Sequence, residues 1–234
     1  IKEEQAKAAV QLIDEGNTIP FIARYRKEMT GALNDETLRN LHERLLYLRN
    51  LEEKKEQVIN AITEQGKMTD DLKKKILAAE TLVAVDDLYR PYRPKKQTRA
   101  TKAKEKGLEP LANILLLQAT SKSMEEEAQS FVDEAKGVTN AKEALAGAKD
   151  IIAEMIADKA DYRKSIRNCT MKQGRLVVKA KDEKAESVYE MYYDYHERVN
   201  RIVSHRILAI NRAEKEKVIT VNINVNKDFL IEYI

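Results

Sequence analysis

A chain of 234 residues, 43% of them hydrophobic, is long enough for one large domain or two smaller ones with a real core. Charged residues make up 35% of the chain while Gly (7) and Pro (4) are scarce, a balance typical of helix-rich proteins. The formal net charge of +3 excludes a global field that attracts nucleic acid or membranes, so such a partner must contact a local patch.

Other compositional features narrow the class of protein. The sequence has no run near the ~18 apolar residues of a membrane span and no apolar signal-peptide region, so we expect a soluble, cytoplasmic protein. A single cysteine, Cys169, excludes an internal disulfide and a CxxC zinc site and fits a reducing compartment. Because the chain starts at Ile1 and stops within "DFLIEYI", which resembles the start of another element, we expect a piece of a longer protein.

Residues 1–85 are predicted to form a helical hairpin region. A leucine stripe at three- and four-residue spacing predicts a helix of about thirty residues, capped by Asn34 or Asp35. At ~1.5 Å per residue this rod of roughly 45 Å needs a partner packed along it. The candidate partner is a helix that starts at Thr69 or Asp70. We expect it to bury three leucines against residues 72–77: Leu41, Leu45 and Leu48.

A first helix over residues 2–15 and a short second helix precede this rod. Pro20 fits the first turn of the short helix, because a residue there needs no backbone N–H. We expect its apolar side chains, with Phe21 as the main anchor, to reach the hairpin core: Ile19, Phe21 and Ile22. Its cations form a charged ridge that either faces a partner or bridges helices structurally: Arg24, Arg26 and Lys27.

Residues 86–110 are predicted to be a basic, proline-containing connector. Pro91 and Pro94 each disfavour helix in the residue before them, so we expect an extended segment. From Arg90 to Lys106 eight cations stand against one glutamate, with Tyr89 and Tyr92 at the start of this tract.

The remaining chain is predicted to hold two further regions. Residues 111–173 have short, closely spaced helical patterns, with a capping box at Ser123 and Glu126, and form a helical subdomain. Residues 174–234 form a small α/β element, because "RLVVKAK" and "VITVNINV" are rich in β-branched residues and read as two strands. The predicted fold class is therefore mainly α: a multi-helix scaffold with a long helical hairpin and a small two-stranded β element near the C-terminus.

The sequence carries few signs of catalysis. It lacks the motifs GxxxxGK(S/T), GxGxxG, GxSxG and HExxH of common phosphate-binding, nucleophilic and zinc sites. His196 near Asp194 is a conceivable metal pair, but only three histidines exist to complete a set, and ordinary packing is the simpler interpretation. We predict no enzyme activity, no cofactor, no metal and no small-molecule substrate for this region.

The basic tract is the best candidate for a nucleic-acid contact. Cations bind phosphates by releasing counterions, and tyrosine rings can stack on unpaired bases. The candidate binding residues are Arg90, Arg93, Lys95, Lys96, Arg99, Lys102 and Lys104. An alternative stays open: Arg90 and Arg93 pair with carboxylates such as Asp86 and Asp87 and hold the segment against the helices.

Three long motifs resemble one known family. "GNTIPFIARYRKEMTGALND", "DLYRPYRPKKQTRATKAKEKGLEPLA" and "SHRILAINRAEKE" are similar to the Tex family of bacterial transcription accessory proteins, in order along nearly the whole chain. The resemblance implies the N-terminal region of a larger protein, before an RNase H-like domain, a helix-hairpin-helix region and an RNA-binding S1 domain.

Two functions follow from the resemblance as expectations. The first is a scaffold of a transcription accessory protein that binds nucleic acid, RNA more than DNA, weakly and non-specifically through this region. The second is a protein-interaction platform that docks onto the transcription machinery without nucleic-acid contact. An enzyme of nucleic-acid processing would need acidic metal ligands from the RNase H-like part.

Overall fold

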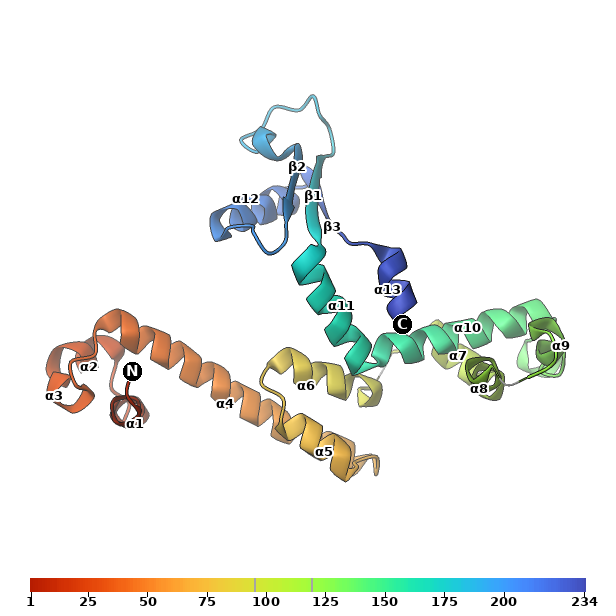
Figure 1. Cartoon of the computed structure of the whole chain (residues 1–234), viewed down its shortest axis with the longest axis horizontal. Coiled ribbons are helices and arrows are strands. Elements are labelled where there is room, and N and C mark those ends of the chain that lie inside the picture. Colours follow the sequence, from red (N-terminus) through yellow and green to blue (C-terminus); the bar gives the residue numbers. More distant parts are fainter. Residues whose placement is uncertain (95, 119) are drawn as a thin grey trace. The chain divides into compact units, whose positions relative to one another are not determined.

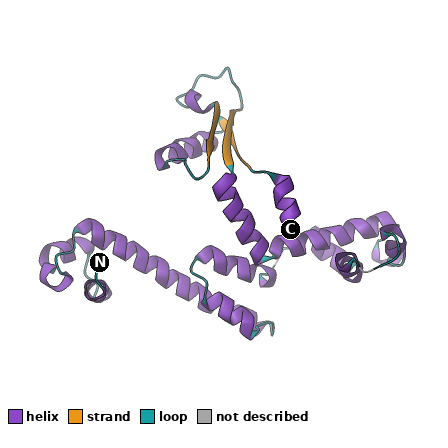
Figure 2. Cartoon of the chain, viewed as in Figure 1, coloured by secondary structure: helices purple, strands orange, loops and turns teal. Residues whose placement is uncertain are grey.

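A computed structural model of the chain describes residues 1–94, 96–118 and 120–234. Most of the described chain is helical, and its strands lie together in one small sheet near the C-terminus (Figures 1 and 2). The predicted mainly α fold is therefore confirmed. The chain divides into two compact units, Ile1–Tyr92 and Arg93–Ile234, which are described separately. Within the described residues, no helix combines the length and hydropathy needed to cross a membrane.

Helices joined by short turns make up the N-terminal unit. In chain order they are α1 (Glu3–Asp14), α2 (Ile19–Tyr25), α3 (Lys27–Thr30), α4 (Asp35–Glu64), α5 (Asp70–Leu77), α6 (Leu82–Tyr89) and the 3-10 helix η1 (Arg90–Tyr92). The Asn34 side chain accepts a hydrogen bond from the Thr37 N–H at 2.8 Å, and Thr69 does the same for Leu72 at 3.2 Å. The caps predicted at Asn34 and Thr69 are confirmed, since each satisfies a free N–H of a first turn.

The long helix α4 serves two hydrophobic clusters. Its start packs with α1 and α2, where Leu12, Ile22 and Leu38 are fully buried. Its second half packs with α5 and α6 around Val58 and Ile62. Because two sets of short helices cover it in succession, the 30-residue helix is supported along both halves.

The partner helix α5 runs back along α4. Lys55 Nζ, in the middle of α4, donates a hydrogen bond to the Leu77 carbonyl at the end of α5 (2.9 Å), so the two helices are antiparallel. The expected burial of three leucines against this partner is wrong, because eight-residue α5 covers only the second half of α4. Leu41 instead packs on the first cluster, and Leu48 is exposed.

The buried face of α2 also differs from the prediction. Ile22 is 0% exposed and Ile19 packs against the first cluster, whereas Phe21 is 37% exposed and is not the anchor. Helical geometry explains the difference, since Ile19 and Ile22 lie three residues apart on one face while Phe21 is turned about 100° away from Ile22.

The predicted extended connector is largely helical, so that expectation is wrong. α6 continues to Tyr89, η1 contains Pro91, and α7 (Arg99–Glu105) begins after a short segment. Pro91 fits the tight 3-10 turn, and Thr98 starts a new helix as its N-cap. Among the described connector residues, those between Tyr92 and Arg99 and those between Glu105 and Glu109 are not helical.

The C-terminal unit begins as a helical cluster and ends as a small sheet. Its elements are α7, α8 (Glu109–Leu117), α9 (Met124–Gln129), η2 (Glu134–Lys136), α10 (Ala141–Asp158), α11 (Ala160–Gln173), β1 (Arg175–Ala180), η3 (Glu190–Tyr192), β2 (Asp194–Arg198), α12 (Ser204–Lys215), β3 (Ile219–Asn224) and α13 (Lys227–Tyr233). The capping box at Ser123 and Glu126 is present at the start of α9, as predicted.

The sheet is antiparallel with strand order β2-β1-β3. The two predicted strands are β1 and β3, paired in a register that sets Val178 opposite Val221. The third strand, β2, was not predicted, because "DYHER" is too polar to resemble a strand by composition. It pairs with β1 and contributes Tyr195 to a core that also holds Ile210 of α12.

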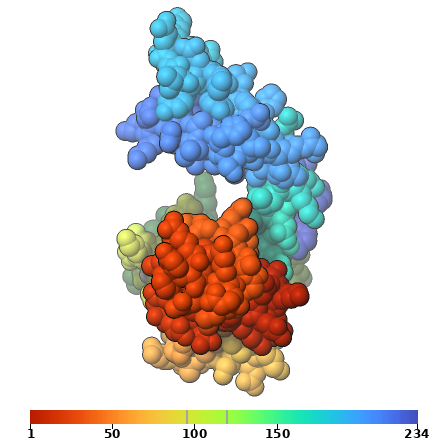
Figure 3. Space-filling model, turned by 90° about the vertical axis from the view of Figure 1, so that its left-hand side faces the viewer, coloured from red at the N-terminus to blue at the C-terminus, as the bar shows by residue number. Residues whose placement is uncertain are grey.

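Two peripheral parts of this unit complete the fold. The residues between β1 and η3 form the light-blue tip of the sheet module in Figure 3. At the other end of the module, α13 lies beside α11, where the Tyr233 hydroxyl is 2.8 Å from Ser165 Oγ. The Tyr162 and Tyr233 rings also meet edge to face, with centroids 6.3 Å apart.

Candidate nucleic-acid interface

The helix α7 carries most of the described part of the basic tract. It begins at Thr98, whose Oγ1 accepts the Thr101 N–H at 3.0 Å and donates to Glu154 Oε1 of α10 at 3.0 Å. It ends before Gly107, whose φ of +82° favours glycine. One polar side chain therefore both starts α7 and fixes its N-terminal end on α10.

α7 packs closely on α10 because small residues face each other. Ala100 and Ala103 are buried against α10. A Cβ built on Gly147 of α10 would lie 2.4 Å from Leu108 Cδ1 and 3.2 Å from Ala103 Cβ, so no larger residue fits there without a shift. This contact positions the long cationic side chains of α7 beside the surface of α10.

A groove of about 320 Å³ lies along this contact. Its cations come from α7 and from Lys106, the C-cap residue that follows it, at positions three and four residues apart, which places them on one side of the helix. Two carboxylates of α10 stand on the opposite side of the groove. The charged side chains that line it are Arg99, Lys102, Lys106, Glu143 and Asp150.

The carboxylates neutralise part of this cation row. Arg99 Nη2 lies 3.4 Å from Asp150 Oδ1, but the Arg99 side chain remains 87% exposed, so water screens the pair and Arg99 stays accessible. Hydrogen bonds from the Thr139 backbone N–H and hydroxyl hold the pKa of Glu143 below its ordinary value, and the charge of Lys106 is a smaller cause. Lys106 itself donates to the Gly137 carbonyl at 2.7 Å.

The structure distributes the predicted binding residues over both units. Arg90 belongs to the N-terminal unit and the tract from Arg93 onward to the C-terminal unit. Arg90 and Arg93 both have partners in the fold. Lys95 lies outside the described residues, and Lys96 is exposed just before α7. Lys104 is paired with Glu109 at 3.3 Å.

The tyrosines of the tract are partly engaged inside the N-terminal unit. Tyr89 and Tyr92 are half-buried and pack against the cluster that α4, α5 and α6 form. The Tyr92 carbonyl also accepts a hydrogen bond from Gln65 Nε2 at 3.0 Å. Their packing leaves only part of each ring exposed, and the expectation that these rings stack on bases stays a prediction.

The charged ridge of the N-terminal unit is only partly free. Arg24 and Lys27 are exposed, as expected of a surface ridge. Arg26 instead lies over the Phe21 ring, with its Cζ 5.1 Å from the ring centroid, and donates from Nη1 to the Tyr25 carbonyl at 3.1 Å.

Sequence reasoning missed the groove itself. Lys106 was counted in the tract but not among the binding residues, and Glu143 and Asp150 were not considered. The available signal was the spacing of Arg99, Lys102 and Lys106, which marks one helix face once Thr98 is recognised as an N-cap.

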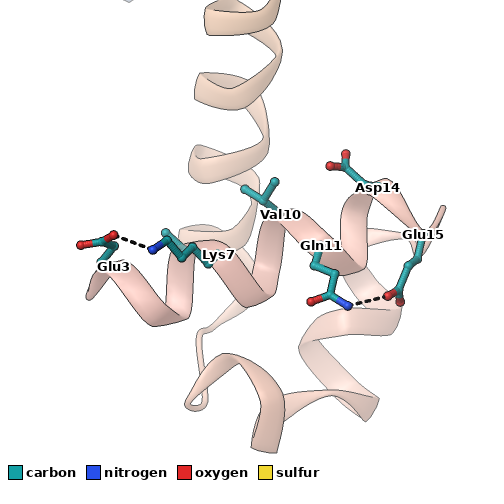
Figure 4. A pocket seen from close by; sticks show the side chains of 7 residues that line it. Glu3, Lys7, Val10, Gln11, Asp14 and Glu15 are labelled. Atoms are coloured by element: carbon teal, nitrogen blue, oxygen red, sulfur yellow. Dashed lines mark hydrogen bonds and ion pairs between the residues drawn. The ribbon is translucent and has the colours of Figure 1, made fainter.

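Other surface features do not form a comparable site. A depression of about 620 Å³ on the N-terminal unit is lined by α1 and the residue after it (Figure 4). Its polar side chains already have partners, Glu3 with Lys7, Gln11 with Glu15 and Asp14 with Arg49 of α4. Among the described residues, no group of three or more His, Cys, Asp or Glu side chains could hold a metal ion. His196 is exposed on β2.

Two family models match the chain. The Tex-like protein N-terminal domain matches residues 1–63, and the Tex central region-like model matches residues 119–230. The chain belongs to the Tex family.

Three relatives illustrate the range of similarity. The chain is 43% identical over 237 residues to YdcI of Bacillus subtilis (strain 168), aligning 100% of this chain with 33% of YdcI. It is 42% identical over 227 residues to the transcriptional accessory protein Tex of Neisseria gonorrhoeae, aligning 96% of this chain with 30% of that protein. It is 33% identical over 227 residues to S1 RNA-binding domain-containing protein 1 of Homo sapiens, aligning 93% of this chain with 22% of that protein. The chain thus spans about a third or less of these relatives.

Proposed function

We propose that this region is the N-terminal scaffold of a transcription accessory protein and binds single-stranded RNA weakly along α7. The observation that carries the proposal is the cation row of α7, in which Arg99, Lys102 and Lys106 lie on one helix face above a shallow groove. The names of the relatives, a transcriptional accessory protein and an S1 RNA-binding domain-containing protein, support the same partner.

The chemistry of the groove favours backbone contacts without base readout. The exposed cations can bind phosphates and release counterions, a contribution that does not depend on sequence. Four contacts, from the α7 row and Lys96, give a log affinity that falls against log salt with a slope of about −3, at ~0.7 per contact. Because Asp150 and Glu143 oppose part of this charge, we expect a dissociation constant in the non-specific range of roughly 10⁻⁴ to 10⁻⁶ M.

The test uses charge reversal with a matched control. We expect the Arg99→Glu/Lys102→Glu variant to lose most of its affinity for a labelled single-stranded RNA 12-mer, measured by fluorescence anisotropy at two salt concentrations. The control, Lys73→Glu/Lys74→Glu on the exposed face of α5, changes the net charge equally and should bind nearly as well as the wild type. Equal affinities of the two variants, or a salt-independent affinity, would falsify the proposal.

The second candidate function is a protein-interaction platform that docks onto the transcription machinery without touching nucleic acid. The pairing of tract cations inside the fold favours it, since Arg99 and Lys104 have carboxylate partners and Arg90 is also engaged. Binding of purified polymerase subunits that survives the α7 charge reversal, with no RNA binding, would support this candidate instead.

The proposal also covers catalysis and location. It assigns this region no enzyme activity, no cofactor and no small-molecule substrate, and it places the protein in the cytoplasm, where the family resemblance predicts a transcription partner. RNase activity of the purified chain that survives removal of contaminating nucleases would contradict the non-enzymatic assignment.

A further inference from the structure

The exposed face of α2 is unusual for a surface helix. Ile22 is buried, and the side of the helix next to it carries two aromatic rings, because Phe21 directly precedes Ile22 and Tyr25 follows it by three residues. Phe21 is 37% and Tyr25 61% exposed. Met29 of the following helix α3 is exposed as well. The exposed positions of a surface helix are normally polar, because an apolar side chain left in water does not gain the free energy of burial. Two exposed rings on a seven-residue helix therefore indicate a binding surface rather than a solvated face.

The rings are held in a defined arrangement. Phe21 and Tyr25 lie one helical turn apart, with ring centroids 5.3 Å apart and planes tilted by 47°. The Arg26 guanidinium lies over the Phe21 ring, and its hydrogen bond to the Tyr25 carbonyl keeps it there. Tyr25 remains largely exposed after both contacts, so a planar ligand can reach it without rearrangement of the helix.

The charge around the rings is positive. Arg24, Arg26 and Lys27 stand against one carboxylate, Glu28, within residues 19–30. Alternation of rings and cations within one short stretch matches the chemistry of single-stranded nucleic acid, in which bases with π faces alternate with phosphates.

A protein partner is the other class that such a patch could take. Tyr, Arg and Met are common at protein–protein hot spots, but the cores of those interfaces are depleted in charged residues. The cations here lie directly beside the rings in sequence and form no separate rim. Charge complementarity therefore favours the nucleic acid.

We propose that the exposed face of α2 is a stacking platform for a single-stranded nucleic acid. Tyr25 stacks on one base, and Arg24 and Lys27 contact the phosphates on either side of it. The platform belongs to the N-terminal unit and shares no residue with the α7 groove, so this inference does not rest on the proposed function of α7.

Photo-crosslinking locates the contact directly. The full chain is irradiated with a single-stranded U12 RNA that contains 5-iodouridine, and the crosslinked residue is identified by peptide mapping. We expect the crosslink at Tyr25, because this chemistry favours a ring stacked on the base. Crosslinks confined to other regions would overturn the inference.

Binding measurements separate stacking from charge. Tyr25→Ala should weaken binding of the U12 RNA by about five-fold or more, the lower end of the range for one stacked base, without changing the salt slope. Tyr25→Phe keeps the ring and should bind like the wild type. Arg24→Ala should reduce the salt slope by about 0.7. Leu77→Ala, an exposed apolar residue on α5, is the matched control and should change neither quantity.

The outcomes for the two surfaces are distinguishable. If the α7 reversal removes binding while Tyr25→Ala matches the control, the α2 inference fails, the α7 proposal stands and the patch is left to a protein partner. If Tyr25→Ala weakens binding and the α7 reversal does not, the α2 inference stands and the α7 proposal fails. Because both rings are exposed, the variants should keep the wild-type circular dichroism spectrum, which checks that they fold.

Discussion

The helices α2 and α7 are of equal length and expose cations, yet they differ in what accompanies those cations. On α2 the cations stand beside exposed aromatic rings, and Arg26 is held over one of them. On α7 they face carboxylates of α10 across a groove, with Arg99 paired to Asp150. A run of basic residues therefore has two different meanings. Basic residues beside aromatic rings can support stacking. Basic residues opposite carboxylates can stabilise the fold as well as bind a partner.

The anchoring of the two helices also differs. α2 is held by large apolar side chains, chiefly Ile22, whereas α7 is held by alanines that pack closely on α10 and by the cap of Thr98. Substitutions at matched positions test this difference.

The largest expected effect is at the anchor of α2. Ile22→Ala removes a fully buried side chain from the first cluster and should lower the free energy of unfolding by about 2 to 5 kcal/mol. Phe21→Ala removes an exposed ring and should cost much less. Chemical denaturation of both variants checks the pair, and a Phe21→Ala loss as large as that of Ile22→Ala would show that the ring, not the isoleucine, anchors the helix.

A smaller effect is expected at the N-caps. Thr98→Ala removes a capping hydrogen bond and the contact to Glu154, and should cost about 1 kcal/mol of stability in the C-terminal unit. Thr18 occupies the same position of α2, but among the described residues its side chain makes no capping hydrogen bond. Thr18→Ala should therefore be nearly neutral. Equal shifts in the thermal unfolding midpoint would contradict this difference between the helices.

The smallest expected effect is on pH dependence beside α7. The pKa of Glu143 is depressed by its hydrogen bonds to Thr139, so its ionised form stabilises the fold. That contribution is present above the ordinary glutamate pKa of roughly 4.3 and is lost as the pH falls through the lower pKa of the folded state.

Replacing this carboxylate isolates its contribution. Glu143→Gln should lower the unfolding midpoint at pH 7 and flatten its decline toward acid. Lys142→Gln, at the neighbouring exposed position, is the control and should keep the wild-type pH profile. A Glu143→Gln profile parallel to that of the wild type from pH 7 to pH 3 would contradict the assignment.

The comparison of α2 and α7 also shows where sequence reasoning stopped. Phe21 was expected inside because it is large and apolar, but one step along a helix rotates a side chain by about 100°, and Ile22 occupies the inward position. The segment from Arg99 to Lys106 was expected to be extended, so the helix face that joins Arg99, Lys102 and Lys106 was not predicted. Pro91 and Pro94 predict extended backbone nearby, whereas the structure begins a helix at Thr98, whose side chain caps it.

The sequence by itself determined the features that local chemistry controls. The caps at Asn34 and Ser123, the β-branched strands β1 and β3 and the mainly α composition depend on neighbouring residues in the chain, so they could be predicted. The family resemblance was also readable from contiguous motifs.

Only the tertiary structure decided which surfaces meet. Leu41 faces α1 and α2 and not α5, polar β2 is a strand because β1 supplies its hydrogen bonds, and the cations of α7 oppose carboxylates some fifty residues away in sequence. Burial and pairing of this kind depend on contacts between distant segments, and these contacts decide which of several acceptable local conformations and exposures each segment adopts.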